Sequence, residues 1–425
     1  MVKIVSVHAR QVLDSRGNPT VEAELSTSRG HFSAIVPSGA STGAHEAMEL
    51  RDGAKEYAGK GVLKAVENVN SIISPKVSGR DFFSLDELDS FLNSLDGTAN
   101  KSALGANAIL PVSMAFCRAL ASHESMRLFE YIGRVSGTKD FVLPVPFLNV
   151  LNGGKHAGRE NDIQEHMLVP SGFASFSEAL RAGTETYHVL KGILRKKYGG
   201  EAALLGDEGG FCPKSASLDD RLEMMGKAVS EAGYSGEVHI ALDCASSEFF
   251  KDGNYNIDGK EYTPMELVDF YAALVERFGL VSIEDGFAED DWSGWRLFNS
   301  RMGKKIEIVG DDLLVTSVSR MKAAIERKAC NALLLKVNQI GTVTESVEAA
   351  RLAFRSQWRV MVSHRSGESE DSFISDLVVG LAAGQSKFGA PARSERTAKY
   401  NQLLRIEEAL AETGKAKFAG KGPSA

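Results

Sequence analysis

Six apolar runs in the last two thirds of the sequence each end in a charged or titratable residue. These ends are Asp243, Glu284, Asp311, Lys336, His364 and Lys387. They lie 41, 27, 25, 28 and 23 residues apart, and each of the last four steps matches one strand plus one helix. Amphipathic segments alternate with the runs, as in FSEALRAGTETYHVLKGILRKKYG, where Ser175 and Glu178 predict a helix start. This repeat predicts a parallel sheet, most simply a closed (β/α) barrel.

A barrel places the carboxyl ends of its strands around one opening, where active sites lie. Asp243, Glu284 and Asp311 should therefore converge there, with no cation among them until Lys336. Three bare carboxylates would repel one another. Such a density of oxygen ligands indicates a divalent cation, Mg²⁺ above all, rather than structural salt bridges alone.

The lysine that ends ALLLK needs its own explanation. A lysine at a strand end often extends its charge into solvent, and that reading is open for Lys336 taken alone. Beside Mg²⁺, Arg365 and Lys387, however, the pKa of Lys336 should fall below its ordinary value of about 10.4. An uncharged lysine can act as a base. This favours proton abstraction from a carbon next to a carboxylate that the metal binds.

The first third of the chain has a different pattern of apolar and polar residues. KIVSVHARQVLD, VEAELS and HFSAIVP alternate like strands and are separated by turn clusters, which predicts an antiparallel meander. A small-residue loop around Ser41 follows, of a composition that suits a mobile lid. Residues from about 45 to 133 have helical spacing. We therefore expect an α+β domain over residues 1–136 and the barrel over residues 137–425.

Composition narrows the classes of function. The net charge is −7 and lysines and arginines are not clustered, which argues against a nucleic-acid partner but not against a small phosphorylated substrate. Four scattered cysteines predict reduced thiols. The N-terminus lacks the apolar core of a signal peptide, and no apolar run approaches the length of a membrane span. We therefore expect a cytoplasmic protein without a membrane span.

Three further segments carry titratable residues in loops or at the start of a strand. NGGKHAG contains His156, DIQEHMLVP contains Glu165 at the start of an apolar run, and LGDEGGF contains Glu208. Each is weak evidence alone, because an acid flanked by glycines is usually part of a turn.

Taken together, these segments resemble the enolase family over nearly the whole chain. The matching motifs are long and in order: DSRGNPTVE, VPSGASTGAHEA, FLNVLNGGKHAG, GDEGGF, LDCASSEFF, SIEDGFAEDDW, LLLKVNQIGT, MVSHRSGESED and GQSKFGAPARSERTAKYNQLLRIEE. The resemblance implies an N-terminal α+β domain, a barrel with an irregular start, and reversible dehydration of 2-phosphoglycerate to phosphoenolpyruvate.

The resemblance also implies roles for individual residues. Asp243, Glu284 and Asp311 match the ligands of one Mg²⁺, and Ser41 matches a ligand of a second that arrives with substrate. Lys336 matches the base, and Glu208, with Glu165 as its partner, matches the acid that releases the hydroxyl. The remaining matches are contacts to substrate: Arg365 and Ser366 to the phosphate, Lys387 to the carboxylate, and His156 and His364 closing over it.

Two positions depart from the usual family pattern. His166 stands where phenylalanine is usual, so it either adds a titrating group near Glu165 or points away. Gly286 stands where proline is usual and could loosen the strand end that holds Glu284.

Other readings stay open beside this one. The chain could be another lyase or a racemase of the same superfamily, or an inactive relative with a binding or structural role. The family resemblance also implies a homo-oligomer, a dimer above all.

Overall fold

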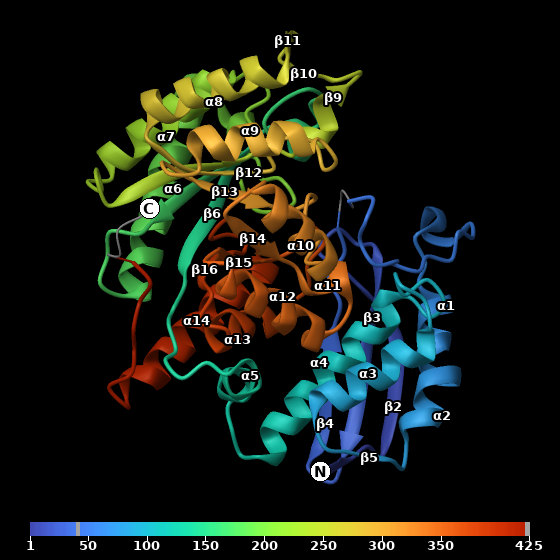
Figure 1. The fold of residues 1–425 in the computed structure, drawn as a ribbon. Helices are drawn as coiled ribbons and strands as arrows, with labels where there is room; N and C mark the ends of the chain where they lie inside the picture. Colours follow the sequence, from blue (N-terminus) through green and yellow to red (C-terminus); the bar gives the residue numbers. More distant parts are fainter. Residues whose placement is uncertain (40–42, 421–425) are drawn as a thin grey trace.

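The computed structural model describes residues 1–39 and 43–420. An N-terminal part is built on an antiparallel sheet, and a C-terminal part on a closed barrel (Figure 1). The predicted meander is confirmed, with strand order β2–β3–β4 and antiparallel pairing throughout. Its strands are β2 (Ser6–Leu13), β3 (Pro19–Thr27) and β4 (Gly30–Ile35). A separate short pair joins β1 (Val2–Lys3) to β5 (Asp81–Phe82).

Helical structure begins later than the spacing predicted. The longer helices are α3 (Leu85–Asp96), α4 (Ala106–His123) and α5 (Leu128–Ser136). They are preceded by a short turn at Glu56–Gly59, by α1 (Leu63–Glu67), by a π-helical stretch at Asn68–Ile73 and by α2 (Ser74–Val77). Residues 45–55 form no helix, because their backbone groups bond to distant segments. Ala47 N–H donates to Gln339 O at 2.8 Å, and Met48 N–H donates to Asn100 O at 2.7 Å.

Eight strands close the barrel in the order β12–β13–β14–β15–β16–β6–β7–β8. Their bounds are β6 (Val145–Asn152), β7 (Glu165–Pro170), β8 (Val238–Asp243), β12 (Leu280–Glu284), β13 (Glu307–Gly310), β14 (Ala332–Leu335), β15 (Arg359–Ser363) and β16 (Gly384–Lys387). Seven of them run parallel, as predicted. The exception is β7, which is antiparallel to both β6 and β8.

Helices surround the barrel (Figure 1). They are α6 (Phe176–Tyr198), α7 (Leu218–Glu231), α8 (Pro264–Phe278), α9 (Trp292–Met302), α10 (Val318–Arg327), α11 (Val337–Ile340), α12 (Val343–Arg355), α13 (Phe373–Gly380) and α14 (Ser394–Ala411). The expected start of α6 is confirmed, since Ser175 Oγ accepts from Glu178 N–H. A small antiparallel sheet of β9 (Phe250–Lys251), β10 (Asn254–Ile257) and β11 (Lys260–Tyr262) lies in the long step between β8 and β12.

The inside of the barrel is filled with apolar side chains. They form one cluster: Val145, Phe147, Met167, Val169, Ala241, Val309, Ala332, Leu334 and Met361. The barrel is therefore a packed core that holds the strand ends in fixed positions, and not a channel. Within residues 1–39 and 43–420, no helix is long and apolar enough to cross a membrane.

The N-terminal part caps one barrel helix directly. At the start of α12, Val343 N–H donates to Ser113 Oγ at 3.1 Å and Thr344 N–H donates to Asp89 Oδ2 at 3.0 Å. Both acceptors belong to helices of the N-terminal part, α4 and α3. Two otherwise unsatisfied amides of a barrel helix thus depend on the other part of the chain.

Candidate active site

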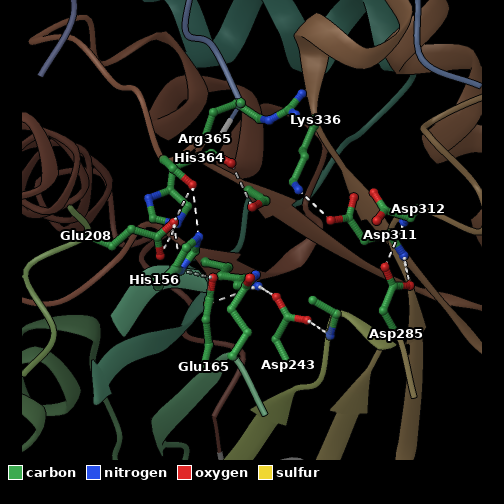
Figure 2. Close-up of a pocket in the computed structure, with 16 residues that line it drawn as sticks. His156, Glu165, Glu208, Asp243, Asp285, Asp311, Asp312, Lys336, His364 and Arg365 are labelled. Carbon is green, nitrogen blue, oxygen red and sulfur yellow. Dashed lines mark hydrogen bonds and ion pairs between the residues drawn. The ribbon is translucent and has the colours of Figure 1, made fainter. Parts of the chain in front are cut away.

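Side chains from the predicted strand ends meet at one mouth of the barrel, where Figure 2 labels Asp243, Asp311, Lys336 and His364. Asp243, Glu284 and Lys387 are the last residues of β8, β12 and β16, while Asp311 and Lys336 directly follow β13 and β14. The pocket at this mouth is lined by Gly39, His156, Gln164, Glu165, Glu208, Asp243, Ala245, Asp285, Asp311, Asp312, Lys336, Ser363, His364, Arg365, Ser366 and Lys387.

The reversed direction of β7 brings Glu165 to the same mouth. Glu165 is the first residue of β7 and lies opposite Asp243, the last residue of β8. A parallel strand would have placed its first residue at the other end of the barrel. The antiparallel strand therefore adds an acid that the βα repeat alone does not supply.

Lys387 lies among three carboxylates. Its Nζ is 2.8 Å from Asp243 Oδ2, 2.8 Å from Glu284 Oε1 and 3.1 Å from Glu165 Oε2. Burial alone would lower the pKa of Lys387, but the acids outweigh it, Asp243 most, and raise the pKa well above the ordinary value. The ammonium is therefore firmly charged.

The acids at this mouth have more negative charge than the described cations satisfy, which fits a divalent metal. Glu284 is 1% exposed, contacts the pocket-lining Lys387 through Oε1, and its Oε2 has no hydrogen-bond partner among the described residues. Burial, followed by the charge of Asp243, raises the pKa of Glu284 well above its usual range. Oxygen donors only, one of them unpartnered, are the chemistry that Mg²⁺ requires.

A second group of acids lies beside this one. Carboxylate oxygens of Asp285, Asp311 and Asp312 all lie within 4.8 Å of one another. Asp285 accepts hydrogen bonds from the N–H groups of Asp311 and Asp312, both at 2.9 Å. Asp285 thereby fixes the turn that presents Asp311 to the pocket. Ser41, the expected ligand of a second Mg²⁺, lies outside the described residues.

Lys336 is held over the pocket by Asp311, whose Oδ2 lies 2.5 Å from its Nζ. Burial lowers the pKa of Lys336, but the neighbouring acids, Asp311 first and then Glu284, raise it, and the pKa lies above the ordinary value. The expected lowering was for Lys336 beside bound Mg²⁺, and it stays a prediction for the metal-bound site. Without the metal, the direct contact with Asp311 favours the charged form of Lys336.

Residues that sequence reasoning missed hold Lys336 and Asp311 in place. Thr316 Oγ1 accepts from Lys336 N–H and donates to Gln339 Oε1, both at 2.9 Å, and Gln339 Nε2 donates to Asp311 Oδ1 at 2.8 Å. Thr316 has a φ of 55°, which β-branched residues rarely adopt. Gln339 is within LLLKVNQIGT, so its motif was visible, but its contact with Asp311 depends on the turn of α11.

Glu208 lies at the other side of the pocket within a network of donors. His364 Nε2 is 3.2 Å from Glu208 Oε2, Asn149 Nδ2 donates to the same oxygen at 2.9 Å, and Ser366 Oγ donates to Oε1 at 3.0 Å. Although burial raises it, the pKa of Glu208 is held well below its usual range by the neighbouring histidines, His364 first.

The pKa of Glu165 is shifted in the opposite direction to that of Glu208. Burial, and then the charge of Glu208, raise the pKa of Glu165 well above its usual range. His156 Nδ1 lies between the two acids, 3.5 Å from Glu165 Oε1 and 3.9 Å from Glu208 Oε1. Glu165 therefore binds a proton more readily than Glu208, and His156 lies between the two acids.

Arg396 fixes the orientation and tautomer of His364. Its Nη1 donates to His364 Nδ1 at 2.6 Å and to Arg365 O at 2.6 Å. Since Nδ1 accepts, the ring proton is on Nε2, which faces Glu208. Arg396 lies in GAPARSER, a motif that the sequence analysis assigned to the family without a role.

Arg365 is bound by a residue from the N-terminal part of the chain. Its guanidinium donates to Glu46 Oε2 at 2.9 Å and Oε1 at 3.1 Å, and to Asn338 Oδ1 at 2.9 Å. Burial lowers the pKa of Arg365, but Glu46 more than compensates and raises it. Arg365 therefore remains a cation that can contact an anionic substrate.

The two departures from the family pattern have small effects on the site. His166 is fully buried and points away from the mouth: its Nδ1 donates to Leu151 O at 3.2 Å and its Nε2 accepts from Arg221 Nε at 3.1 Å. Burial and Arg221 lower the pKa of His166, so it adds no charge near Glu165. A Cβ at Gly286 would lie 3.0 Å from Phe298 Cε1, so this turn is closely packed without a side chain.

Two protein-family models match this chain. "Enolase, N-terminal domain" matches residues 4–132, and "Enolase, C-terminal TIM barrel domain" matches residues 140–424. The chain is also 55% identical over 420 residues to the enolase of Methanocaldococcus jannaschii, an alignment that covers 99% of this chain and 97% of the relative. These matches include every strand end and loop that forms the pocket.

Proposed function

This chain belongs to the enolase family and is a phosphopyruvate hydratase, a lyase of glycolysis, and we propose how its residues divide the reaction. The reaction converts 2-phosphoglycerate to phosphoenolpyruvate and water, reversibly. The proposal rests on one observation above all: Lys336 and Glu208 enter the pocket from opposite sides (Figure 2). A base and an acid so placed can act on neighbouring carbons of one small substrate.

Binding comes first. Arg365 and Ser366 contact the phosphate, and the ammonium of Lys387 contacts the carboxylate, as the family resemblance implies. The Arg365–Glu46 contact ties this phosphate-binding arginine to the N-terminal part, where the loop of Ser41 is also found in the sequence. We infer that Glu46 orients Arg365 before the substrate arrives.

The metal ligands we propose are Asp243, Glu284 and Asp311 for one Mg²⁺, with Ser41 and substrate oxygens for a second. When bound, Mg²⁺ stabilises the extra negative charge that proton loss from C2 places on the substrate carboxylate. The unpartnered Oε2 of Glu284 and the raised pKa of its carboxyl support this assignment.

The chain's own residues then move two protons. Lys336 Nζ, in its neutral form, takes the proton from C2. On the other side, Glu208 and Glu165 deliver one proton to the C3 hydroxyl, which leaves as water while the C2–C3 double bond forms. The opposite pKa shifts of the two acids, raised for Glu165 and lowered for Glu208, and the position of His156 between them support the paired action.

Alternative functions have less support. Both family models that match this chain, and the relative that is 55% identical to it, are enolases rather than racemases or other lyases of the superfamily. An inactive binding protein would be expected to have lost one of the proposed catalytic groups, and each is present in the sequence. We further propose a cytoplasmic homodimer, with the N-terminal domain ending at residue 136, the last residue of α5.

The test follows the rise in ultraviolet absorbance as 2-phosphoglycerate becomes phosphoenolpyruvate with Mg²⁺ present. Lys336→Ala should lower kcat by at least about 10²–10⁴-fold, because it removes the group that we propose takes the C2 proton. Lys322→Ala, which removes an exposed lysine of α10, is the matched control and should keep full activity.

Two results would count against the proposal. If the wild type does not turn over 2-phosphoglycerate in the presence of Mg²⁺, the proposed function is wrong. An active Lys336→Ala variant would leave the reaction in place but assign the base elsewhere.

A further inference from the structure

A second pocket lies at the opposite end of the barrel from the catalytic residues. It is about 300 Å³ in volume and is formed where most barrel strands begin and where the antiparallel β7 ends. We call it the lower pocket; it is lined by Val145, Phe147, Val169, Ser171, Val281, Glu307, Arg359, Ala383, Gly384, Gln385 and Ala419. None of these residues has a part in the proposed reaction.

A buried acid stands in this pocket with half of its carboxylate unused. Glu307 is the first residue of β13, and its side chain is only 4% exposed. Its Oε2 accepts from Gln385 Nε2 at 2.7 Å and from Arg359 Nη1 at 3.1 Å. Its Oε1 has no hydrogen-bond partner among the described residues, and the same holds for Gln385 Oε1. Two buried acceptors therefore lack a donor, which is costly unless a ligand supplies it.

The charges in the lower pocket favour a cation as that donor. Arg359 is paired with Glu307, but its side chain is 44% exposed, so solvent screens its charge far more than that of the buried carboxylate. Burial also raises the pKa of Glu307, although Gln385 and Arg359 lower it, which agrees with a carboxylate whose charge is only partly compensated.

The apolar walls of the lower pocket indicate what the rest of the ligand is made of. Val145, Phe147, Val169, Val281 and Ala383 present apolar surface, which a hydrated inorganic ion does not use but an aliphatic chain does. We propose that the lower pocket binds a primary ammonium group carried on a short aliphatic chain, with the ammonium donating to Glu307 Oε1 and Gln385 Oε1.

Two sources could supply such a group. One is a free small amine. The other is the chain itself, because Lys421 follows Ala419, a lining residue, by two positions in the sequence and lies outside the described residues. The chemistry is the same in both cases, and the experiment separates them.

The probe is n-butylammonium, titrated against the full-length chain by ligand-observed NMR, with n-butanol as the neutral match of equal length. Wild type should bind the amine with a Kd on the order of 1 mM, and the alcohol at least about tenfold more weakly. Glu307→Gln keeps the shape of the acid but removes its charge, and should weaken amine binding at least about tenfold. Ala383→Leu keeps the charge, fills the pocket, and should have the same effect.

Both variants should retain wild-type catalytic activity, which shows that the barrel is intact. Lys421→Met identifies the source: tighter amine binding in this variant means that the lysine competes for the pocket, and unchanged binding means that a free amine is the ligand. Equal amine binding by wild type and Glu307→Gln would overturn the proposal. So would the absence of binding in both wild type and Lys421→Met, which would leave water or a protonated Glu307 to satisfy the two oxygens.

Discussion

At the scale of single residues, the geometry around Glu208 depends on a buried arginine. Arg396 donates to His364 Nδ1 and so keeps the ring proton on Nε2, toward Glu208. Burial, with the charge of Arg396 acting in the same direction, lowers the pKa of His364 to about 4. Arg396 touches no part of the proposed substrate path, so it is a positioning residue.

Replacing Arg396 by glutamine should therefore change the rate and its pH dependence together. We expect kcat to fall about 10–100-fold, by analogy with metal-bound histidines that lose the partner orienting the ring. The acidic limb of the kcat/KM profile should move to higher pH, because the pKa of His364 rises when the arginine's charge is gone.

Arg396→Lys is the control for this prediction. It keeps a cation in place and should hold the acidic limb near its wild-type position. A glutamine variant with lower activity but an unchanged pH profile would mean that Arg396 serves the fold alone.

The residues that could be read from the sequence are those at strand ends. Asp243, Glu284 and Lys387 were expected at one mouth because strand length and spacing determine where a strand stops. Glu46, Thr316 and Gln339 could not be found in this way. Their roles come from contacts between segments that are far apart in the chain, and no local pattern encodes those contacts.

At the scale of secondary-structure elements, β7 shows what a repeat can and cannot predict. The apolar run that starts at Glu165 was recognisable, but its direction was not, since parallel and antiparallel buried strands share the same composition. Its register also matters. A slip of one residue would exchange Glu165 and His166 between the mouth and the outer face.

The start of α12 joins the two parts of the chain and makes stability depend on pH. Burial raises the pKa of Asp89 to about 6, above its unfolded value near 3.9. The folded chain thus binds more protons than the unfolded chain between these values, so this group's contribution to stability is lost as pH rises through 6.

Asp89→Asn removes that titration while keeping an acceptor for Thr344 N–H. Between pH 5 and pH 7.5 the wild type should therefore lose about 1 kcal/mol of unfolding free energy that the variant does not lose. Urea denaturation at the two pH values measures this. Asp86→Asn, at an exposed position of the same helix, should show no such shift, and an equal shift in both variants would contradict the assignment.

At the scale of the whole molecule, the proposed metal ligands lie at the ends of three neighbouring strands, β8, β12 and β13, so the folded sheet brings them together. Mg²⁺ should then stabilise the folded chain, by about 2.7 kcal/mol at a hundredfold excess over its Kd. Calorimetry should show a Tm that rises by several degrees with MgCl₂, and more than with NaCl at equal ionic strength.

Asp243→Asn should remove most of that rise, whereas Glu276→Gln, at an exposed position of α8, should keep it. A full rise in the Asp243 variant would place the ion elsewhere. Because the measurement is thermal, it separates metal binding from any effect on turnover.

Closure of the barrel through β16 and β6 has a consequence for synthesis. Val145 pairs with Gln385, so the first barrel strand meets its last neighbour only when nearly the whole chain has left the ribosome. At ordinary rates of translation that wait is on the order of tens of seconds. During it, β6 has an open edge to which a strand from another nascent chain could pair. A messenger RNA truncated anywhere before codon 387 would therefore encode a chain that cannot close the barrel. Such a chain would have no partial activity and would be left to the cell's quality control.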